Sequence, residues 1–200
     1  TVTTTLANVS GTDVISLTST ETTADATALV ALAGKVATAD AKAFASVTTI
    51  TEAGVTVGTD GATVVSALNI AGNDAAVNIT GTISAVSLDA IANATSKVVT
   101  AALDANTVIS DATVTALSHV NAADVITLNS TVVTADASAL VALNALTDTH
   151  TYANLTKITE AAADVASVKG ALDILGADTQ TTNVQITDGT ITKTAFDLIH

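Results

Sequence analysis

The sequence predicts an elongated parallel α/β solenoid of about seven strand–helix coils. Two observations predict this fold class: an internal repeat and an unusual composition. The stretch 13–33 (DVISLTSTETTADATALVALA) returns at 124–144 as DVITLNSTVVTADASALVALN, 111 residues later, with apolar and polar positions both kept. Such repeats are typical of arrays in which neighbouring units bury one another's apolar surface. We therefore expect residues 1–200 to form a single repeat array without an internal domain boundary.

The composition favours a slim array over a thick globule. Apolar residues make up 48% of the chain, yet aromatic residues make up only 2%, and Trp, Met and Cys are absent. Ala, Val, Ile and Leu must therefore fill the core, and these side chains suit a narrow, regular interior. Without cysteine the chain has no disulfides and no thiolate metal ligands.

The charge argues against two classes of partner. The net charge is −13, and all six basic residues are lysines. Nucleic acids and anionic membrane surfaces are bound through clustered Lys and Arg, so we expect neither as a partner. No apolar run in the sequence approaches the roughly 18 residues of a membrane span, and no signal-peptide pattern opens it.

Seven short runs mark units that start near residues 14, 47, 77, 107, 125, 156 and 184, and two types of unit alternate along the chain. Each run is rich in Val, Ile and Thr, which favour strands. The expected strands are 14–17, 47–51, 77–80, 107–110, 125–128, 157–159 and 184–187. Because no hairpin signal joins consecutive runs, we expect the strands to pair in parallel through right-handed crossovers. The strands would form one sheet along the solenoid axis, and the helices would lie on the opposite side of the solenoid.

Ala/Leu-rich stretches with helical spacing follow the runs. The expected N-caps are Thr23 and Thr134, each followed two residues later by an aspartate in the first turn. The expected left-handed C-caps are Gly34 and Gly176. The apolar side chains that we expect to be buried between coils are Ile126, Leu140, Leu143, Ile158, Val165 and Leu172.

The two ends of the sequence lack a polar capping unit. Residues 4–13 align with 115–124, which we expect to close a helix and form the next turn, so we expect the chain to open in the middle of a coil. We therefore expect a segment of a longer protein, or one whose ends meet neighbouring copies. The apolar residues expected at those ends are Leu6, Val9, Phe196 and Ile199.

Three stretches resemble a known group of proteins: 47–54 (VTTITEAG), 79–96 (ITGTISAVSLDAIANATS) and 157–168 (KITEAAADVASV). They are similar to the tandem repeats of very large cell-surface or secreted proteins of marine cyanobacteria and other bacteria. The resemblance covers nearly the whole chain and implies an extracellular structural or adhesive role. It supplies no functional residues.

We expect a structural repeat segment of a bacterial surface layer, sheath, filament or adhesin stalk, acting by rigid length and self-association. Its partners would be copies of itself or adjacent repeats. We expect no enzyme, since no Walker loop, no GxGxxG and no GxSxG elbow occurs. The histidines His119, His150 and His200 share no metal-ligand spacing.

The alternative is an adhesion module that binds calcium or carbohydrate through its turns or its sheet face. The candidate calcium ligands are Asp60, Asp74, Asp178 and Asp188, each in a turn rich in Gly, Asn or Asp. Calcium takes six to eight oxygen ligands from such loops, but the same residues also simply make tight turns. No cofactor other than calcium is expected.

Overall fold

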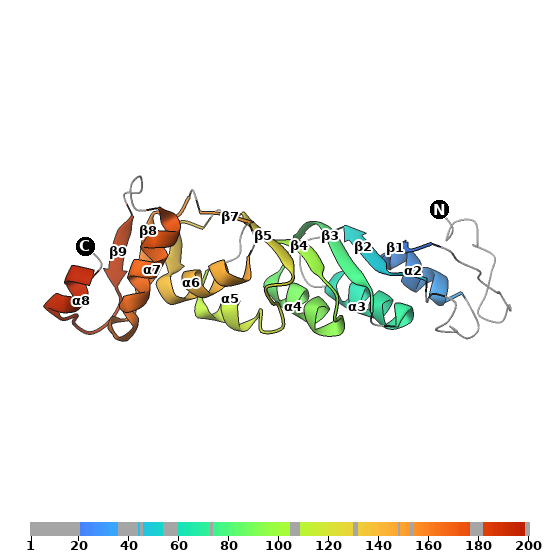
Figure 1. The fold of residues 1–200 in the computed structure, drawn as a ribbon, viewed down its shortest axis with the longest axis horizontal. Coiled ribbons are helices and arrows are strands. Elements are labelled where there is room, and N and C mark those ends of the chain that lie inside the picture. Colours follow the sequence, from blue (N-terminus) through green and yellow to red (C-terminus); the bar gives the residue numbers. More distant parts are fainter. Residues whose placement is uncertain are drawn as a thin grey trace.

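The structure is a computed structural model that describes residues 21–35, 44, 46–53, 60–72, 74–104, 109–129, 132–147, 149–152, 154–176 and 182–198. The body is elongated, and the chain runs from one end to the other (Figure 1). Its strands are β1 (Thr23–Asp25), β2 (Thr49–Ala53), β3 (Ala76–Ile83), β4 (Val99–Leu103), β5 (Val125–Asn129), β6 (Thr134–Asp136), β7 (Thr149–Thr151), β8 (Lys157–Glu160) and β9 (Asn183–Ile186). Its helices are α2 (Ala26–Ala33), α3 (Asp60–Ala71), α4 (Ala85–Ala94), α5 (Asp111–Thr115), α6 (Ala137–Leu146), α7 (Ala166–Leu175) and α8 (Lys193–Leu198), with a 3-10 turn η2 (Ala162–Asp164).

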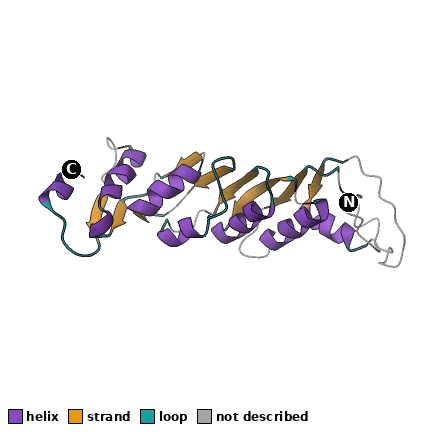
Figure 2. Cartoon of the chain, turned by 60° about the horizontal axis from the view of Figure 1, so that its bottom comes forward, coloured by secondary structure: helices purple, strands orange, loops and turns teal. Residues whose placement is uncertain are grey.

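The fold is α/β with parallel sheets. Six strands pair in the order β1-β2-β3-β4-β5-β7 and three in the order β6-β8-β9. Every one of these pairings is parallel, which confirms the predicted strand direction. Helices lie along one side of the strands (Figure 2). Here a coil means a strand together with the helix that follows it.

The prediction of one continuous sheet is wrong, because the strands divide between two sheets. Only residues 130–133 separate β5 from β6. A parallel neighbour in the same sheet needs a crossover of a dozen or more residues. β6 therefore cannot pair beside β5, and it starts the second sheet. The backbone N–H of Asp136 in β6 donates to the carbonyl of Ile109 at 3.1 Å.

The predicted strands agree with the structure in part. Ranges 47–51, 77–80, 125–128, 157–159 and 184–187 overlap β2, β3, β5, β8 and β9. Range 14–17 lies outside the described residues, and in range 107–110 the described residues 109–110 are not in a strand. β1, β4, β6 and β7 are not among the predicted strands, and β1, β6 and β7 are only three residues long.

The helix caps also differ from the prediction. Asp25 and Asp136, not the threonines before them, are the N-caps of α2 and α6. Gly176 ends α7 with the positive φ that was predicted, 75°. Gly34 has a φ of −67°, which residues other than glycine also adopt, so the prediction of a left-handed C-cap there is wrong. Thr23 and Thr134 instead begin the strands β1 and β6, whose three residues lead directly into the helices.

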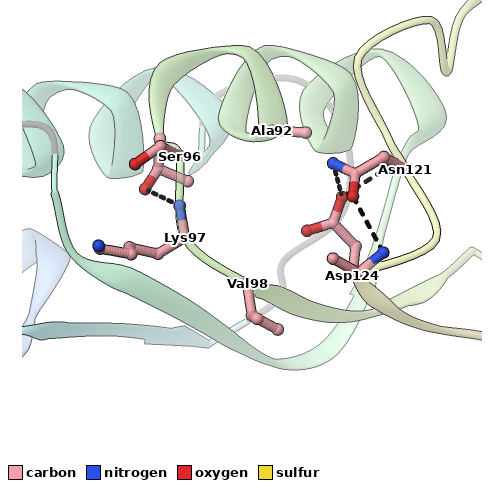
Figure 3. Close-up of a pocket in the computed structure, with 8 residues that line it drawn as sticks. Ala92, Ser96, Lys97, Val98, Asn121 and Asp124 are labelled. Atoms are coloured by element: carbon pink, nitrogen blue, oxygen red, sulfur yellow. Dashed lines mark hydrogen bonds between the residues drawn. The ribbon is translucent and has the colours of Figure 1, made fainter.

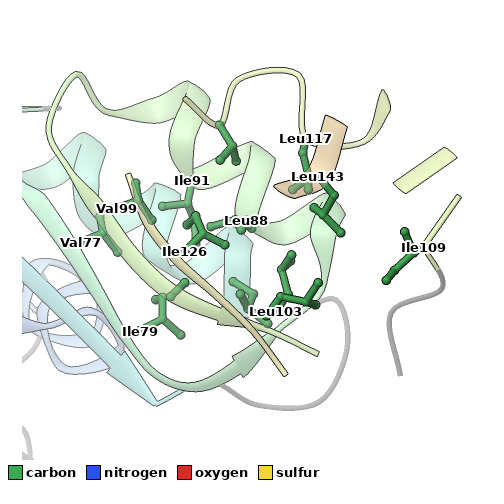
Figure 4. Close-up of a cluster of buried hydrophobic side chains, with 14 of the residues drawn as sticks. Val77, Ile79, Leu88, Ile91, Val99, Leu103, Ile109, Leu117, Ile126 and Leu143 are labelled. Atoms are coloured by element: carbon green, nitrogen blue, oxygen red, sulfur yellow. The ribbon is translucent and has the colours of Figure 1, made fainter. Parts of the chain in front are cut away.

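The core lies between the strands and the helices (Figure 4). Ile50, Val77 and Val99 are register neighbours across β2, β3 and β4 and are at most 1% exposed. Leu88 and Ile91 of α4 pack in the same cluster and are fully buried. Of the residues predicted to be buried, Ile126, Leu140, Leu143, Ile158 and Val165 are buried, whereas Leu172 is only partly buried.

The sequence repeat is also a repeat of strand register. Thr23, Thr49 and Ala76 are consecutive partners across β1-β2-β3. Thr134, Lys157 and Asn183 are the matching partners across β6-β8-β9. We call these strand triplets, with their helices, the first and second copy. The structural repeat therefore extends well beyond residues 13–33 and 124–144, the two stretches whose sequences are similar.

Candidate functional site

A buried glutamate joins two consecutive coils of the first copy. Glu52 lies in β2 and is 9% exposed. Its Oε2 atom accepts hydrogen bonds from the backbone N–H of Thr27, at 2.9 Å, and from the Thr27 hydroxyl, at 2.8 Å. Its Oε1 atom accepts from the N–H of Ala53 at 3.0 Å. One carboxylate therefore connects β2 to the first turn of α2, the helix of the preceding coil.

The second copy repeats this contact. Glu160 in β8 is 3% exposed, and its Oε2 atom accepts from the backbone N–H of Ser138, in the first turn of α6, at 2.9 Å. Its Oε1 atom accepts from the N–H of Ala161 at 2.8 Å. We call the Glu52 and Glu160 contacts the inter-coil joints. Glu52 and Glu160 are 108 residues apart in the sequence.

An aspartate completes each joint. Asp25 Oδ1 accepts from the N–H of Ala28 at 2.8 Å, and Asp136 Oδ1 accepts from the N–H of Ala139 at 3.1 Å. The first N–H groups of a helix have no partner within the helix, and the positive end of the helix dipole favours carboxylates there. In each copy, therefore, the strand glutamate and the N-cap aspartate satisfy two of these groups between them.

Burial affects the charge of the second joint. Desolvation raises the pKa of the Glu160 carboxyl above its usual value of 4.5, and the nearby carboxylates Asp136 and Asp164 raise it further. The hydrogen bonds from the N–H groups of Ala161 and Ser138 oppose this shift. The joint therefore holds an acidic group whose proton affinity is greater in the folded chain than in water.

Threonine hydroxyls add a second set of contacts between neighbouring coils. Thr51 Oγ1 donates to the carbonyl of Ala24, and Thr159 Oγ1 donates to the carbonyl of Ala135, both at 3.3 Å. These threonines occupy the same register position in β2 and β8. The abundant threonine of this chain thus contributes to strand-to-strand contacts as well as to β-propensity.

A small pocket of about 210 Å³ opens between the end of α4 and the turn before β5 (Figure 3). It is lined by Ala92, Thr95, Ser96, Lys97, Val98, Asn121, Ala123 and Asp124. Asp124 is 3% exposed and accepts from the N–H groups of Val99, at 2.9 Å, and Asn121, at 3.0 Å. Ligand pockets usually measure about 300–1,000 Å³, so this hollow is below that range, and its carboxylate already holds two parts of the backbone together.

A histidine–carboxylate pair links α4 to the turn after α5. His119 Nδ1 lies 2.8 Å from Asp89 Oδ2, and the His119 N–H donates to Asp89 Oδ1 at 2.6 Å. The Ser118 hydroxyl also approaches Nδ1, at 3.2 Å. A catalytic triad needs the acid on Nδ1 and the nucleophile on Nε2. Since both partners here share Nδ1, this arrangement is not a triad.

Comparisons with protein-family models, curated proteins and solved structures returned no match. The resemblance to tandem repeats of bacterial surface proteins therefore stays a prediction.

Two of the four candidate calcium ligands, Asp74 and Asp188, have partners within the described part of the chain. Asp74 pairs with Lys97 Nζ at 3.0 Å, and the ammonium and the Ser96 hydroxyl lower the pKa of its carboxyl. Asp188 Oδ1 accepts from the N–H of Ala162 at 2.8 Å. Asp60 begins α3, which lies far along the body from β9 (Figure 1), and Asp178 lies outside the described residues.

The described ranges contain no group of three or more His, Asp or Glu side chains that could hold a metal ion, and no helix long and apolar enough to cross a membrane. His150 lies in β7, and His200 is not among the described residues.

Sequence reasoning missed the inter-coil joints. The sequence ITEA occurs around both Glu52 and Glu160, but these letters alone assign no role to the glutamates. The available signal was a single carboxylate at one position of an otherwise Val/Ile/Thr-rich strand in both units. A charged residue that interrupts a buried strand twice at the same place indicates a specific partner.

Proposed function

We propose that this chain is a structural repeat segment of a bacterial extracellular surface assembly, and that its coils form an elongated parallel α/β solenoid. The observation that carries the proposal is the repetition of the inter-coil joint. Oε2 of Glu52 and of Glu160 each accepts a backbone N–H at 2.9 Å from the helix of the preceding coil. The chain thus uses its buried carboxylates to connect one coil to the next.

Such joints suit a protein that acts through rigid length. In a repeat array each unit contacts mainly its nearest neighbours, so the stiffness of the array depends on the interfaces between coils. Here each interface of this kind combines strand pairing, a buried apolar layer and a carboxylate bridge. The net charge of −13 favours solubility and limits non-specific association. Specific contact with copies of itself or with adjacent repeats then accounts for assembly.

The extracellular location and the bacterial source rest on the sequence resemblance. The geometry favours this structural role over the calcium- or carbohydrate-binding module, because Asp74 and Asp188 already have protein partners. It also favours it over an enzyme, because the polar groups at the pocket and at His119 bond to one another or to the backbone.

Surface labelling tests the proposal. Antibodies raised against the purified chain are applied to intact and to broken cells of the source bacterium, with an antibody against a cytoplasmic protein as the control. We expect the first antibody to label intact cells and the control to label only broken ones. Labelling by both antibodies only after cell breakage would contradict the proposed role.

A further inference from the structure

The two copies differ in what covers their third strand. In the first copy β3 pairs with β2 on one edge and with β4 on the other. In the second copy β9 pairs with β8, and no strand of the described ranges pairs with its other edge. β3 and β9 occupy the same position, since Ile50 pairs with Val77 and Ile158 pairs with Val184.

Hydrogen-bond direction agrees with this match. The N–H of Ala76 donates to Thr48 in the preceding coil, and the N–H of Val77 donates to Val98, just before β4, at 3.0 Å. In β9 the N–H of Asn183 donates in the same way to Thr156, at 2.8 Å. Because N–H groups alternate sides along a strand, the N–H of Val184 points to the open edge, as that of Val77 points to β4.

The helix that follows each strand extends the match. In α4 the Ser84 side chain accepts from the N–H of Ser87, and in α8 the Thr192 side chain accepts from the N–H of Ala195, both at 3.2 Å. With this alignment Leu88 corresponds to Phe196. Each donates its N–H to its capping residue, at 2.9 Å for Leu88 and at 3.0 Å for Phe196.

Side-chain exposure differs between the matched positions in one consistent direction. Val77, Ile79, Ile83 and Leu88 of the first copy are at most 5% exposed. Their counterparts Val184, Ile186 and Ile191 are partly exposed, and Phe196 is 50% exposed. In the first copy β4 covers the shared face with Val99, Ala101 and Leu103, all at most 4% exposed. The end formed by β9 and α8 is thus an apolar face with an open strand edge.

We propose that this end of the body, β9 with α8, is a docking edge for a further coil of the β4 type, supplied by an adjoining repeat. The partner is a parallel strand with an apolar residue at every second position, as in Val99–Leu103, followed by a turn or helix. Its first carbonyl accepts from Val184, and its apolar side chains cover Val184, Ile186 and Phe196. The inference rests on the proposed function, because it treats the chain as one part of an array.

The test appends residues 93–124 of the chain directly after His200, which corresponds to Ala92 in the alignment of α8 with α4. Amide hydrogen exchange is then followed residue by residue, with Asn183, whose N–H donates to the carbonyl of Thr156 just before β8, as an internal reference. We expect exchange of the Val184 amide to become at least about tenfold slower than in the original chain. The matched control carries Asp in place of the appended Val99 and Leu103, which charges the face that must be buried.

Equal Val184 exchange rates in the appended chain and in its Asp control would overturn the proposal. A second result would also overturn the proposal: Val184 exchange in the original chain that is slow when the chain dimerises and fast when it is monomeric. A second copy of the chain would then occupy the β9 edge. If the appended chain does not fold, the same segment is added as a separate peptide, and a shift of the Val184 amide resonance is expected with the intact peptide alone. Surface labelling of cells is independent of this result, so a failure here leaves the proposed location separately tested.

Discussion

The Oε2 atom of Glu160 in β8 accepts the backbone N–H of Ser138 at 2.9 Å, although 22 residues separate the two in the chain. Glu52 accepts the N–H of Thr27 at the same distance in the first copy. Each glutamate lies in the strand of one coil, and the N–H group that it accepts from lies in the helix of the preceding coil. Two contacts at matching positions indicate a recurring feature of this fold: a strand carboxylate accepts a hydrogen bond from a backbone N–H in the first turn of the neighbouring helix.

Removing a joint should destabilise the fold. Glu160→Ala leaves the partly buried N–H groups of Ser138 and Ala161 without their acceptor, and we expect a loss of about 1–3 kcal/mol in the free energy of unfolding. Glu52→Ala should cost a similar amount, and the two losses should add. Urea unfolding measures each variant. The control Asp173→Ala removes only an exposed pair with Lys169 and should cost about 0.5 kcal/mol or less; equal losses in the control and in Glu160→Ala would rule out the joint as a stabilising contact.

The raised pKa of Glu160 should make the joint depend on pH. A carboxyl whose folded pKa lies above its unfolded value binds its proton more tightly in the folded chain. Its favourable contribution is complete below the usual value of 4.5 and is lost as the pH rises through the folded pKa. The unfolding free energy of the original chain should therefore fall, relative to that of Glu160→Gln, as the pH rises from below 4.5. A difference that stays constant with pH would argue against this shift.

Two leucines on consecutive helices provide a matched test of the core. Leu140 in α6 is fully buried, whereas Leu172 in α7 is only partly buried. We expect Leu140→Ala to lower the free energy of unfolding by about 2–5 kcal/mol, the range for buried leucines, and Leu172→Ala to cost clearly less. Urea unfolding of both variants gives the comparison. A larger loss for Leu172→Ala would mean that α6 is not the more deeply packed helix.

Calcium should not stabilise the chain. Asp74 is paired with Lys97, and Asp188 accepts the N–H of Ala162. A ligand that binds the folded state raises Tm with its concentration. We expect the same Tm in added Ca²⁺, in added Mg²⁺ at equal ionic strength and in a chelator. A rise specific to Ca²⁺ that is lost in Asp74→Asn or Asp188→Asn would favour the adhesion-module alternative.

The α/β class with parallel strands was predictable because its signals are local. The Val/Ile/Thr run at β5 and the repeated letters around α2 and α6 fix element types within a few residues. β4 was missed since its sequence, VTAAL, contains two alanines and so lacks a strong strand signal. β1 and β6, with the sequence TAD, are too short to show any periodicity, and only pairing with β2 and β8 makes them strands.

The candidate site was less predictable than the fold. The aspartates Asp74 and Asp188 sit in turn sequences that suit calcium and ordinary turns equally well, and only their partners distinguish the two. The role of Glu52 depends on a helix start that lies 25 residues earlier. A contact of this kind is set by register between coils, which no local pattern reveals.

Small-angle X-ray scattering on the purified monomer tests the central claim most directly, that the joined coils form one elongated array. A compact globular chain of this length would have a radius of gyration of about 16 Å. We expect a radius of gyration well above that figure, with a distance distribution skewed towards long separations. The double variant Glu52→Ala with Glu160→Ala should have a broader distance distribution than the original chain. A radius of gyration near about 16 Å with a symmetric distribution would contradict the account.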